Sequence, residues 1–341
     1  MSENQPHIYD VVVVGGGAAG LSAAVTLATA RRSVLVVDAG SPRNAASSAV
    51  HGFLSREGTS PLELLAEGRE ELRARGGGLA EGTAVAASGH AGAFTVHLQD
   101  GRALSARRLL IASGFGDELP DVAGIKERWG RDVVHCPYCH GWELRDRAVG
   151  VLATEPEAVQ EALLFRQWSQ NITLFQHTMP EPSALEREQL AARSIRIVEG
   201  GVKGLRIMGD ALTGVTLDSG RVIPCEALVV SPKPVTDSPL LQSLGLQQED
   251  GPSNQYLKTD ESGGTAVAGV WAAGNITDPE AQVITAAASG VKAASAVNAD
   301  LVSDDTRQAV MALNGALSSH RGLSDHPVMD ENRSAGPASR L

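Results

Sequence analysis

Cysteine is scarce in this chain, with only three among 341 residues, which excludes a disulfide-stapled scaffold. Positive charge is also in deficit, because 29 Lys and Arg stand against 40 Asp and Glu and leave a formal net charge of −11. Such an acidic chain is not expected to bind nucleic acid or an anionic membrane. No apolar run approaches the roughly 20 residues of a membrane helix, and the N-terminus lacks the pattern of a signal peptide. We therefore expect a cytoplasmic protein, and its length indicates two domains.

A strand, a glycine-rich turn and a helix open the chain. The β-branched run Val11–Val14 leads into Gly15, Gly17 and Gly20, and a second apolar run ends at Asp38. In such a unit the first glycine allows the tight turn, the second lets the backbone approach a pyrophosphate, and the third lets the helix pack closely on the strand. The helix N-terminus offers N–H groups to the phosphates, and Asp38 is placed to accept the ribose hydroxyls. The pattern predicts a dinucleotide site.

A weaker copy of this plan occupies the middle of the chain. The segments 149–152, 158–168 and 172–175 are typical of strand, helix and strand, and Leu228–Ser231 repeats the character of Leu109–Ser113. A long helix is expected over 281–301. The fold class that follows is α/β, with two Rossmann-like domains, the second inserted into the first. We assign residues 1–118 and 237–303 to the first domain, 119–236 to the inserted domain, and 304–341 to a C-terminal helix and a loose tail.

Cys136-Pro137-Tyr138-Cys139-His140 is the most informative segment. Two cysteines at this spacing can close a disulfide in which one thiol has a lowered pKa, and the adjacent His140 can move the proton that thiol–disulfide exchange requires. Three other interpretations compete: a zinc site, a glutaredoxin-type motif and a pair of inert buried thiols. Zinc would need two more ligands at metal spacing, whereas Cys225 is isolated and is expected to be a core residue.

The late block Gly274-Asn275-Ile276, followed by an alanine-rich helix, decides which dinucleotide is bound. It is similar to the closing motif of flavoproteins with two dinucleotide-binding domains, in which an acid or amide after the glycine contacts the ribityl chain. Those families carry Asp where this chain has Asn275. The resemblance favours FAD over NAD.

Together these segments resemble the low-molecular-weight thioredoxin reductase family over residues 9–301. The resemblance implies a homodimeric FAD enzyme in which Cys139 faces the flavin and Cys136 attacks the outside thiol or disulfide; residues 304–317 are candidates for the dimer interface. That family has an acid where this chain has His140, and Cys-x-x-Cys-His is closer to the branch of gliotoxin- and holomycin-type dithiol oxidases. The FAD-binding residues expected from the glycine motif and the resemblance are Gly15, Gly17, Ala18, Ala19, Gly20, Asp38, Arg43, Asn44, His51, Gly114, Gly274, Asn275, Gln282 and Val283.

The inserted half lacks the residues that hold a second nucleotide. Ala153, Glu155 and Ala158 stand where the first half has its three glycines, and Pro156 removes a backbone donor. Thioredoxin reductases end the next strand in a His-Arg-Arg run that grips the NADPH phosphate, and this chain has Gln-His-Thr at 176–178. Without those charge-assisted hydrogen bonds, phosphate binding should be weak. We therefore do not expect NADPH to be the physiological reductant.

The preferred hypothesis is a cytoplasmic FAD-dependent dithiol–disulfide oxidoreductase that uses Cys136 and Cys139, with His140 handling protons and oxygen as the acceptor. Its partner would be a small dithiol or a thiol protein. Three alternatives remain: an NADPH-dependent thioredoxin reductase with a divergent nucleotide site, a reductase fed by ferredoxin or another flavoprotein, and a flavin-bearing redox sensor that is not an enzyme. No metal site is expected.

Overall fold

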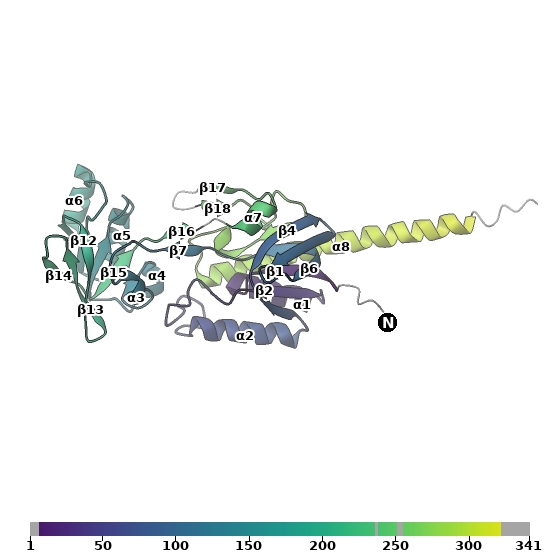
Figure 1. Cartoon of the computed structure of the whole chain (residues 1–341), viewed down its shortest axis with the longest axis horizontal. Coiled ribbons are helices and arrows are strands. Elements are labelled where there is room, and N and C mark those ends of the chain that lie inside the picture. The colour runs from purple at the N-terminus through teal and green to yellow at the C-terminus, as the bar shows by residue number, and fades with distance from the viewer. Residues whose placement is uncertain (1–6, 236–237, 251–254, 322–341) are drawn as a thin grey trace, which may run out of the picture. The chain divides into compact units, whose positions relative to one another are not determined.

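The structure is a computed structural model (Figure 1) that describes residues 7–235, 238–250 and 255–321. The loose tail expected from Leu323 lies outside these residues. In the described part of the chain, no helix combines the length and the apolar character that a membrane crossing requires.

The first half is built on a seven-stranded sheet whose main path runs β3-β2-β1-β6-β5-β4, with β19 added on β6. Strands β1, β2, β3, β6 and β19 are parallel, whereas β4, β5 and β6 form an antiparallel meander. Strands β1, β2 and the end of β6 form the centre of the parallel part because their Val, Leu and Ile runs are buried on both faces. The strands are β1 (Ile8–Val14), β2 (Val34–Asp38), β3 (Gly78–Glu81), β4 (Ala84–His90), β5 (Ala93–Leu98), β6 (Ala103–Ile111) and β19 (Val270–Ala272).

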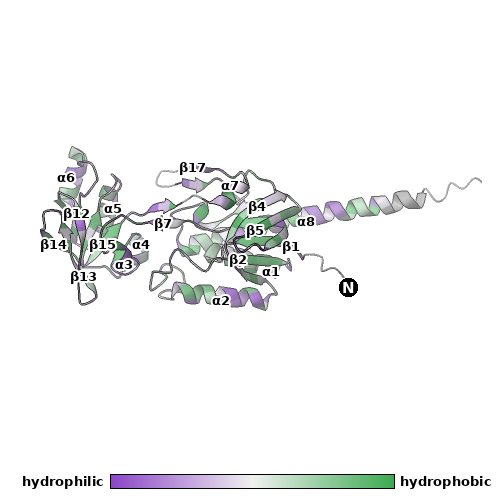
Figure 2. Ribbon diagram, viewed as in Figure 1, coloured by the Kyte–Doolittle hydropathy of each residue, from purple (hydrophilic) through white to green (hydrophobic). Residues whose placement is uncertain are grey.

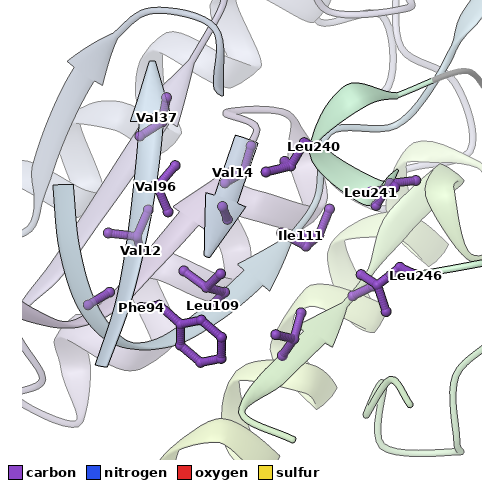
Figure 3. Close-up of a cluster of buried hydrophobic side chains, with 14 of the residues drawn as sticks. Val12, Val14, Val37, Phe94, Val96, Leu109, Ile111, Leu240, Leu241 and Leu246 are labelled. Atoms are coloured by element: carbon purple, nitrogen blue, oxygen red, sulfur yellow. The ribbon is translucent and has the colours of Figure 1, made fainter. Parts of the chain in front are cut away.

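Helices α1 (Ala18–Thr29) and α2 (Pro61–Ala74) contact each other, and α7 (Pro239–Ser243) contacts β4. Leucines of α7 and the residues after it join valines of β1 and β2 and Phe94 of β5 in one buried cluster (Figure 3). Figure 2 shows the central strands in the hydrophobic colour, whereas α2 is coloured as a mixture. This core fixes the carboxyl ends of β1 and β2, where the glycine turn and Asp38 lie.

The middle of the chain forms a five-stranded parallel sheet in the order β11-β10-β9-β15-β8. The path β3-β2-β1-β6 of the first sheet corresponds to β11-β10-β9-β15, so the two halves share the order of four parallel strands. The fifth strand differs: β19 comes last in its half of the chain, whereas β8 comes first in its half. The strands are β8 (Val133–Val134), β9 (Ala148–Leu152), β10 (Asn171–Phe175), β11 (Arg196–Val198) and β15 (Ala227–Val230). The α/β class with two Rossmann-like units is thereby confirmed.

Shorter elements complete the middle of the chain. They are α3 (Ile125–Arg128), α4 (Pro137–His140), α5 (Ala158–Phe165), α6 (Ala184–Ala192) and the antiparallel meander β12 (Val202–Met208), β13 (Ala211–Leu217) and β14 (Val222–Pro224). Strands β7 (Gly116–Glu118) and β16 (Lys233–Val235) pair with each other, so the chain enters and leaves the middle segment side by side. Strands β17 (Gln248–Asp250) and β18 (Gln255–Leu257) form a separate hairpin.

A buried ion pair anchors the start of the five-stranded sheet. Arg128 at the end of α3 donates from Nε to Asp132 at 2.7 Å and also pairs with it through Nη2. Both side chains are at most one tenth exposed. Asp132 also accepts a hydrogen bond from the backbone N–H of Leu212 at 2.9 Å, and its own carbonyl accepts one from Leu228 at 2.8 Å. The pair thus joins α3 and β13 to the entrance of β8, where Asp132 lies three residues before His135.

Helix α8 (Val283–Arg321) is longer than the sequence predicts. A helix over 281–301 followed by a separate helix from 304 is wrong, because the Ser-Asp-Asp run at 303–305 does not end it. The hydroxyl of Ser303 donates to the carbonyl of Ala299, and that of Thr306 to the carbonyl of Val302. Both hydroxyl groups therefore find hydrogen-bond acceptors on their own helix and do not interrupt it. The start of α8, up to Asn298, belongs to the compact unit that contains both sheets, and the helix from Ala299 onward belongs to a second unit. The proposed dimer contact of 304–317 stays a prediction.

Candidate functional site

The glycines between β1 and the first turn of α1 differ in the room that they leave for a side chain. Gly15 has a φ of +109°, and a Cβ there would lie 2.2 Å from the carbonyl oxygen of Ala112. A Cβ on Gly20 would lie 1.9 Å from the carbonyl oxygen of Gly15, so this glycine lets α1 close onto the turn. A Cβ on Gly17, by contrast, would meet no heavy atom within 4 Å. Gly17 also provides no side-chain cap for α1, so its bare backbone is open to a phosphate group.

Gly17→Ala tests this use of open space. We expect the variant to fold with an unchanged melting temperature, because the new methyl group meets no protein atom. It should bind FAD about tenfold or more weakly, because the methyl occupies the space of the pyrophosphate and such overpacking costs about 1–3 kcal/mol. The measurement is a fluorescence titration of deflavinated protein with FAD. Gly315→Ala, which also adds a methyl to open space but on α8, is the control. Equal FAD affinity of both variants and the parent would contradict the assignment.

A cavity of about 1550 Å³ begins at this turn. It is large, and its wall carries both the glycine turn and the cysteine pair, so the chain offers one continuous space for a dinucleotide and a thiol centre. The expected residues that line it are Gly15, Gly17, Ala18, Ala19, Asp38, Arg43, Asn44, Gly114, Cys136, Cys139, His140, Gly274, Asn275, Gln282 and Val283. Gly20 lies beneath the turn and does not line the cavity.

His51 does not line the cavity either. Its ring lies between two carboxylates, with Nδ1 2.6 Å from Glu57 and Nε2 3.2 Å from Glu143. The hydrogen bond from His51 lowers the pKa of Glu57, which also accepts one from the N–H of Gly52. These contacts occupy both ring nitrogens, so a flavin contact for His51 stays a prediction without support from its position.

Asp38 and Arg43 are held by ionic partners at the cavity wall. The carboxylate of Asp38 accepts hydrogen bonds from Arg69 at 2.9 Å and from the N–H of Gly40 at 3.1 Å. Arg43 forms a two-pronged pair with Asp117, both bonds 2.8 Å long, and its guanidinium lies 4.3 Å from the ring centre of Phe115. The sequence does not single out Asp117, because its role depends on a partner 74 residues away.

Asn275 uses its amide nitrogen to hold the loop that precedes α8. The nitrogen donates to the carbonyls of Asp278, Pro279 and Ala281 at 3.1, 3.3 and 3.0 Å. An aspartate has no N–H, so it could not make these bonds. The amide nitrogen therefore serves the loop, and the side-chain oxygen is the atom with which Asn275 could accept a hydrogen bond from a cofactor hydroxyl.

The cysteine pair forms a disulfide on α4. Cys136 is the N-cap of this short helix, and its Sγ accepts a hydrogen bond from the N–H of Cys139 at 3.2 Å. Pro137 begins the helix, where its fixed φ fits and its missing N–H costs nothing. A donor directed at Sγ stabilises negative charge there when the disulfide opens. Cys225 is buried in the core as expected, and burial raises the pKa of its thiol to about 12.

His140 follows Cys139 with its ring largely out of water. Its Nε2 lies 3.4 Å from the hydroxyl of Ser47, and its Nδ1 is buried and makes no hydrogen bond within the described residues. Burial lowers the pKa of this imidazole, so at neutral pH it is uncharged and able to accept a proton. This is the property that a base for thiols requires.

The corresponding turn of the inserted half differs from the glycine turn. Five residues, 153–157, separate β9 from α5, whereas three separate β1 from α1. Glu155 is exposed and lies on the cavity wall, with Lys233 4.0 Å from its carboxylate as a weak counter-charge. His177 Nδ1 accepts a hydrogen bond from the N–H of Val202 at 3.0 Å. The imidazole therefore holds the backbone before β12 and is not a cation that faces a phosphate group. Within the described residues, no group of three or more His, Cys, Asp or Glu is arranged to hold a metal ion.

Comparison with known proteins identifies the family. A model of pyridine nucleotide-disulphide oxidoreductases matches residues 9–293. The chain belongs to this family. Within it, thioredoxin reductase sirT of Leptosphaeria maculans is 31% identical over 310 residues, which are 86% of this chain and 94% of the relative.

Two crystal structures show the same fold at higher identity. That of HlmI is 44% identical with a TM-score of 0.87 and covers 92% of this chain and 100% of that chain. That of an oxidoreductase from Agrobacterium tumefaciens is 37% identical with a TM-score of 0.82 and covers 87% and 99%. The resemblance to thioredoxin reductase-like disulfide oxidoreductases is confirmed. This protein is therefore an FAD-binding oxidoreductase that acts on sulfur groups.

Proposed function

We propose that this protein is an FAD-dependent dithiol oxidase that closes a disulfide in a small molecule and passes the electrons to oxygen. The observation that carries the proposal is that the Cys136–Cys139 disulfide and the glycine turn line one cavity. The turn of the inserted half supports it further, because Glu155 places a negative charge where the phosphates of a second dinucleotide such as NADPH would lie. The FAD-binding set remains the one expected above, with Gly20 acting beneath the turn and His51 the least supported member.

The chain's own residues account for the thiol chemistry. A substrate thiolate attacks Cys136 Sγ, the Cys136–Cys139 bond breaks, and Cys139 leaves as a thiolate. The second substrate thiolate then attacks the mixed disulfide, which releases the oxidised substrate and the enzyme dithiol. His140, uncharged at neutral pH, accepts a proton from a substrate thiol. Bound FAD supplies the remaining chemistry, accepting the electron pair of the enzyme dithiol and delivering it to oxygen, which is reduced to peroxide.

The choice between a dithiol and NADPH as electron donor can be tested in one experiment. The FAD-loaded protein is mixed without oxygen, separately, with NADPH, NADH and dithiothreitol, and its flavin absorbance is followed by stopped flow. We expect rapid loss of absorbance with the dithiol and none on that timescale with either nucleotide. 2-Mercaptoethanol is the matched control, since a monothiol cannot close a disulfide within one molecule.

Each result has a definite meaning. Rapid bleaching by NADPH would instead support an NADPH-dependent thioredoxin reductase, the activity named for the relative from Leptosphaeria maculans. No bleaching by any dithiol would contradict dithiol oxidation. Under air, the dithiol should sustain oxygen consumption, whereas a protein that only senses redox state would be reduced once and stop.

A further inference from the structure

A polar cluster in the inserted half is left unused by the reaction described above. His135, Glu161 and Ser231 all line the cavity that holds the cysteine pair. Their meeting follows from the sheet: β8 and β15 are parallel neighbours, so His135 and Ser231 follow adjacent strands at the same edge. Helix α5, which follows the next strand β9, brings Glu161 to that edge. His135 also directly precedes Cys136 in the chain.

Glu161 is a buried carboxyl group without a permanent cation beside it. Its side chain is 14% exposed. The hydroxyl of Ser231 donates to Oε2 at 3.0 Å, and within the described residues the ion-pair partner of Oε1 is His135 Nδ1, 3.8 Å away. Burial raises the pKa of Glu161 to about 7, and the Ser231 hydrogen bond acts in the opposite direction. A carboxyl group so placed reduces stability when charged, and such groups concentrate at functional sites.

His135 complements this carboxyl group. Its Nδ1 is buried and makes no hydrogen bond within the described residues, and the 3.8 Å to Glu161 is an ion-pair distance longer than a hydrogen bond. Burial, and then the charge of Arg43, lower the pKa of His135, whereas Asp117 and Glu280 act to raise it. His135 is therefore uncharged at neutral pH and able to accept a proton, whereas Glu161 changes charge near pH 7. His135 Nδ1 and Glu161 Oε1, 3.8 Å apart, need only a small movement to form a hydrogen bond.

We propose that Glu161 is a positioning residue for His135, and that this pair takes up the proton that a substrate thiol loses as it attacks Cys136. The inference rests on the proposed dithiol oxidation and deepens it. A dithiol has two thiols to deprotonate, and two histidines flank the cysteine pair in the chain: His140 after Cys139, and His135 before Cys136.

The proton and electron balance of the step is closed. The first substrate thiol gives its proton to the pair, its sulfur bonds to Cys136 Sγ, and the Cys136–Cys139 bond breaks. The second substrate thiol gives its proton to His140, and its sulfur attacks the mixed disulfide. Cys136 then leaves as a thiolate and receives the first proton, while Cys139 remains a thiolate beside the protonated His140. The substrate is oxidised by two electrons and the enzyme disulfide is reduced by two, so this half-reaction needs no further reactant.

The test compares Glu161→Gln, Ser231→Ala and Glu157→Gln with the parent. Glutamine keeps the shape of Glu161 and its acceptor for Ser231 but cannot ionise, and Glu157 is an exposed carboxylate at the start of the same helix. The measurement is the rate at which dithiothreitol reduces the FAD-loaded protein without oxygen, taken on both sides of neutral pH. Ionisation of dithiothreitol itself raises this rate equally in all variants, so the quantity of interest is the ratio of parent to variant.

The expected ratios have a definite sign. Below pH 7 Glu161 is protonated and resembles glutamine, so the ratio for Glu161→Gln is near one; above pH 7 it should rise about tenfold or more. For Glu157→Gln it should stay near one throughout. Ser231→Ala removes the hydrogen bond that holds the pKa of Glu161 down, so its rate profile should move to higher pH. A second readout is independent of turnover: the infrared carbonyl band of a protonated carboxyl group should fade as the pH rises through 7, and be missing in Glu161→Gln.

Several outcomes would overturn the inference. They are a flat ratio for Glu161→Gln, the same step in Glu157→Gln, or an infrared band that survives in Glu161→Gln. Should Glu161→Gln fail to fold or to retain FAD, Ser231→Ala decides, and an unmoved profile counts against the pair. Failure of the proposed function looks different: the parent protein would then consume no oxygen with any dithiol, whatever the pH profile of its reduction.

Discussion

Cys136→Ser and Cys139→Ser should each lower dithiol-dependent oxygen consumption at least about 10³-fold, because either change removes the disulfide that the substrate attacks. The two variants should nevertheless differ in a single-turnover experiment. Cys139→Ser retains the attacked position but has no bond to exchange, so it should be trapped as a mixed disulfide by an oxidised substrate analogue. Cys136→Ser should not be trapped in this way. The trapped species is identified by mass spectrometry of the intact protein.

The third cysteine provides a matched control. Cys225 is buried, with only 2% of its surface exposed. Its thiol donates a hydrogen bond to the carbonyl of Ala227 at 2.8 Å, and a serine hydroxyl can make the same bond. Cys225→Ser should therefore keep full turnover. Full turnover of Cys136→Ser or Cys139→Ser under air would show that the disulfide is not the reaction centre, and loss of turnover in Cys225→Ser would show that serine substitution alone is harmful.

Asp132→Asn should be the most destabilising single charge removal in the inserted half. The change removes the buried carboxylate partner of Arg128 and leaves the guanidinium only the exposed Asp210. Breaking a buried pair costs about 3–5 kcal/mol of the free energy of unfolding. Asp132 also accepts the N–H of Leu212 at 2.9 Å, so the meander β12–β14 should loosen with it. The measurement is equilibrium unfolding in urea.

Asp210→Asn is the matched control, because Asp210 pairs with the same Arg128 at 2.7 Å but from an exposed position. Solvent screens that pair, so a much smaller loss is expected. A dithiol should also reduce the disulfide of the Asp132 variant at a different rate from the parent. Asp132 directly precedes β8, and His135 directly follows it. Equal stability of the two variants would mean that the buried pair contributes no more than the exposed one.

Local patterns made part of this site predictable from sequence. The glycine turn and Asp38 belong to one continuous strand–turn–helix–strand segment, so spacing alone places them, and Cys136 and Cys139 lie within one helical turn. The partners of these residues were not predictable. Asp117 reaches Arg43, and Glu161 reaches Ser231, only after distant strands pair in register. A charged residue within the apolar stretch 158–165 was the one available signal for Glu161.

Two sequence predictions failed or lost support for similar reasons. The Ser-Asp-Asp run at 303–305 resembles a helix end, yet hydroxyl groups that bond their own helix allow α8 to continue. His51 follows the expected order of flavoprotein loops, but Glu57 and Glu143 bind both of its ring nitrogens. In each case short-range hydrogen bonding decides the outcome, and composition does not reveal it.

The shared strand order of the two sheets bears on how such a protein evolves. Both halves share the order of four parallel strands, yet the turn after the first of these has three glycine-rich residues in one half and five, including Glu155 and Pro156, in the other. Strand burial and phosphate contact reside in different residues, and mutation can therefore erase one without unfolding the other. In the mechanism proposed above, the half without the glycine turn supplies the cysteine pair and the carboxyl–imidazole pair, so its strands serve the thiol chemistry without serving a phosphate site.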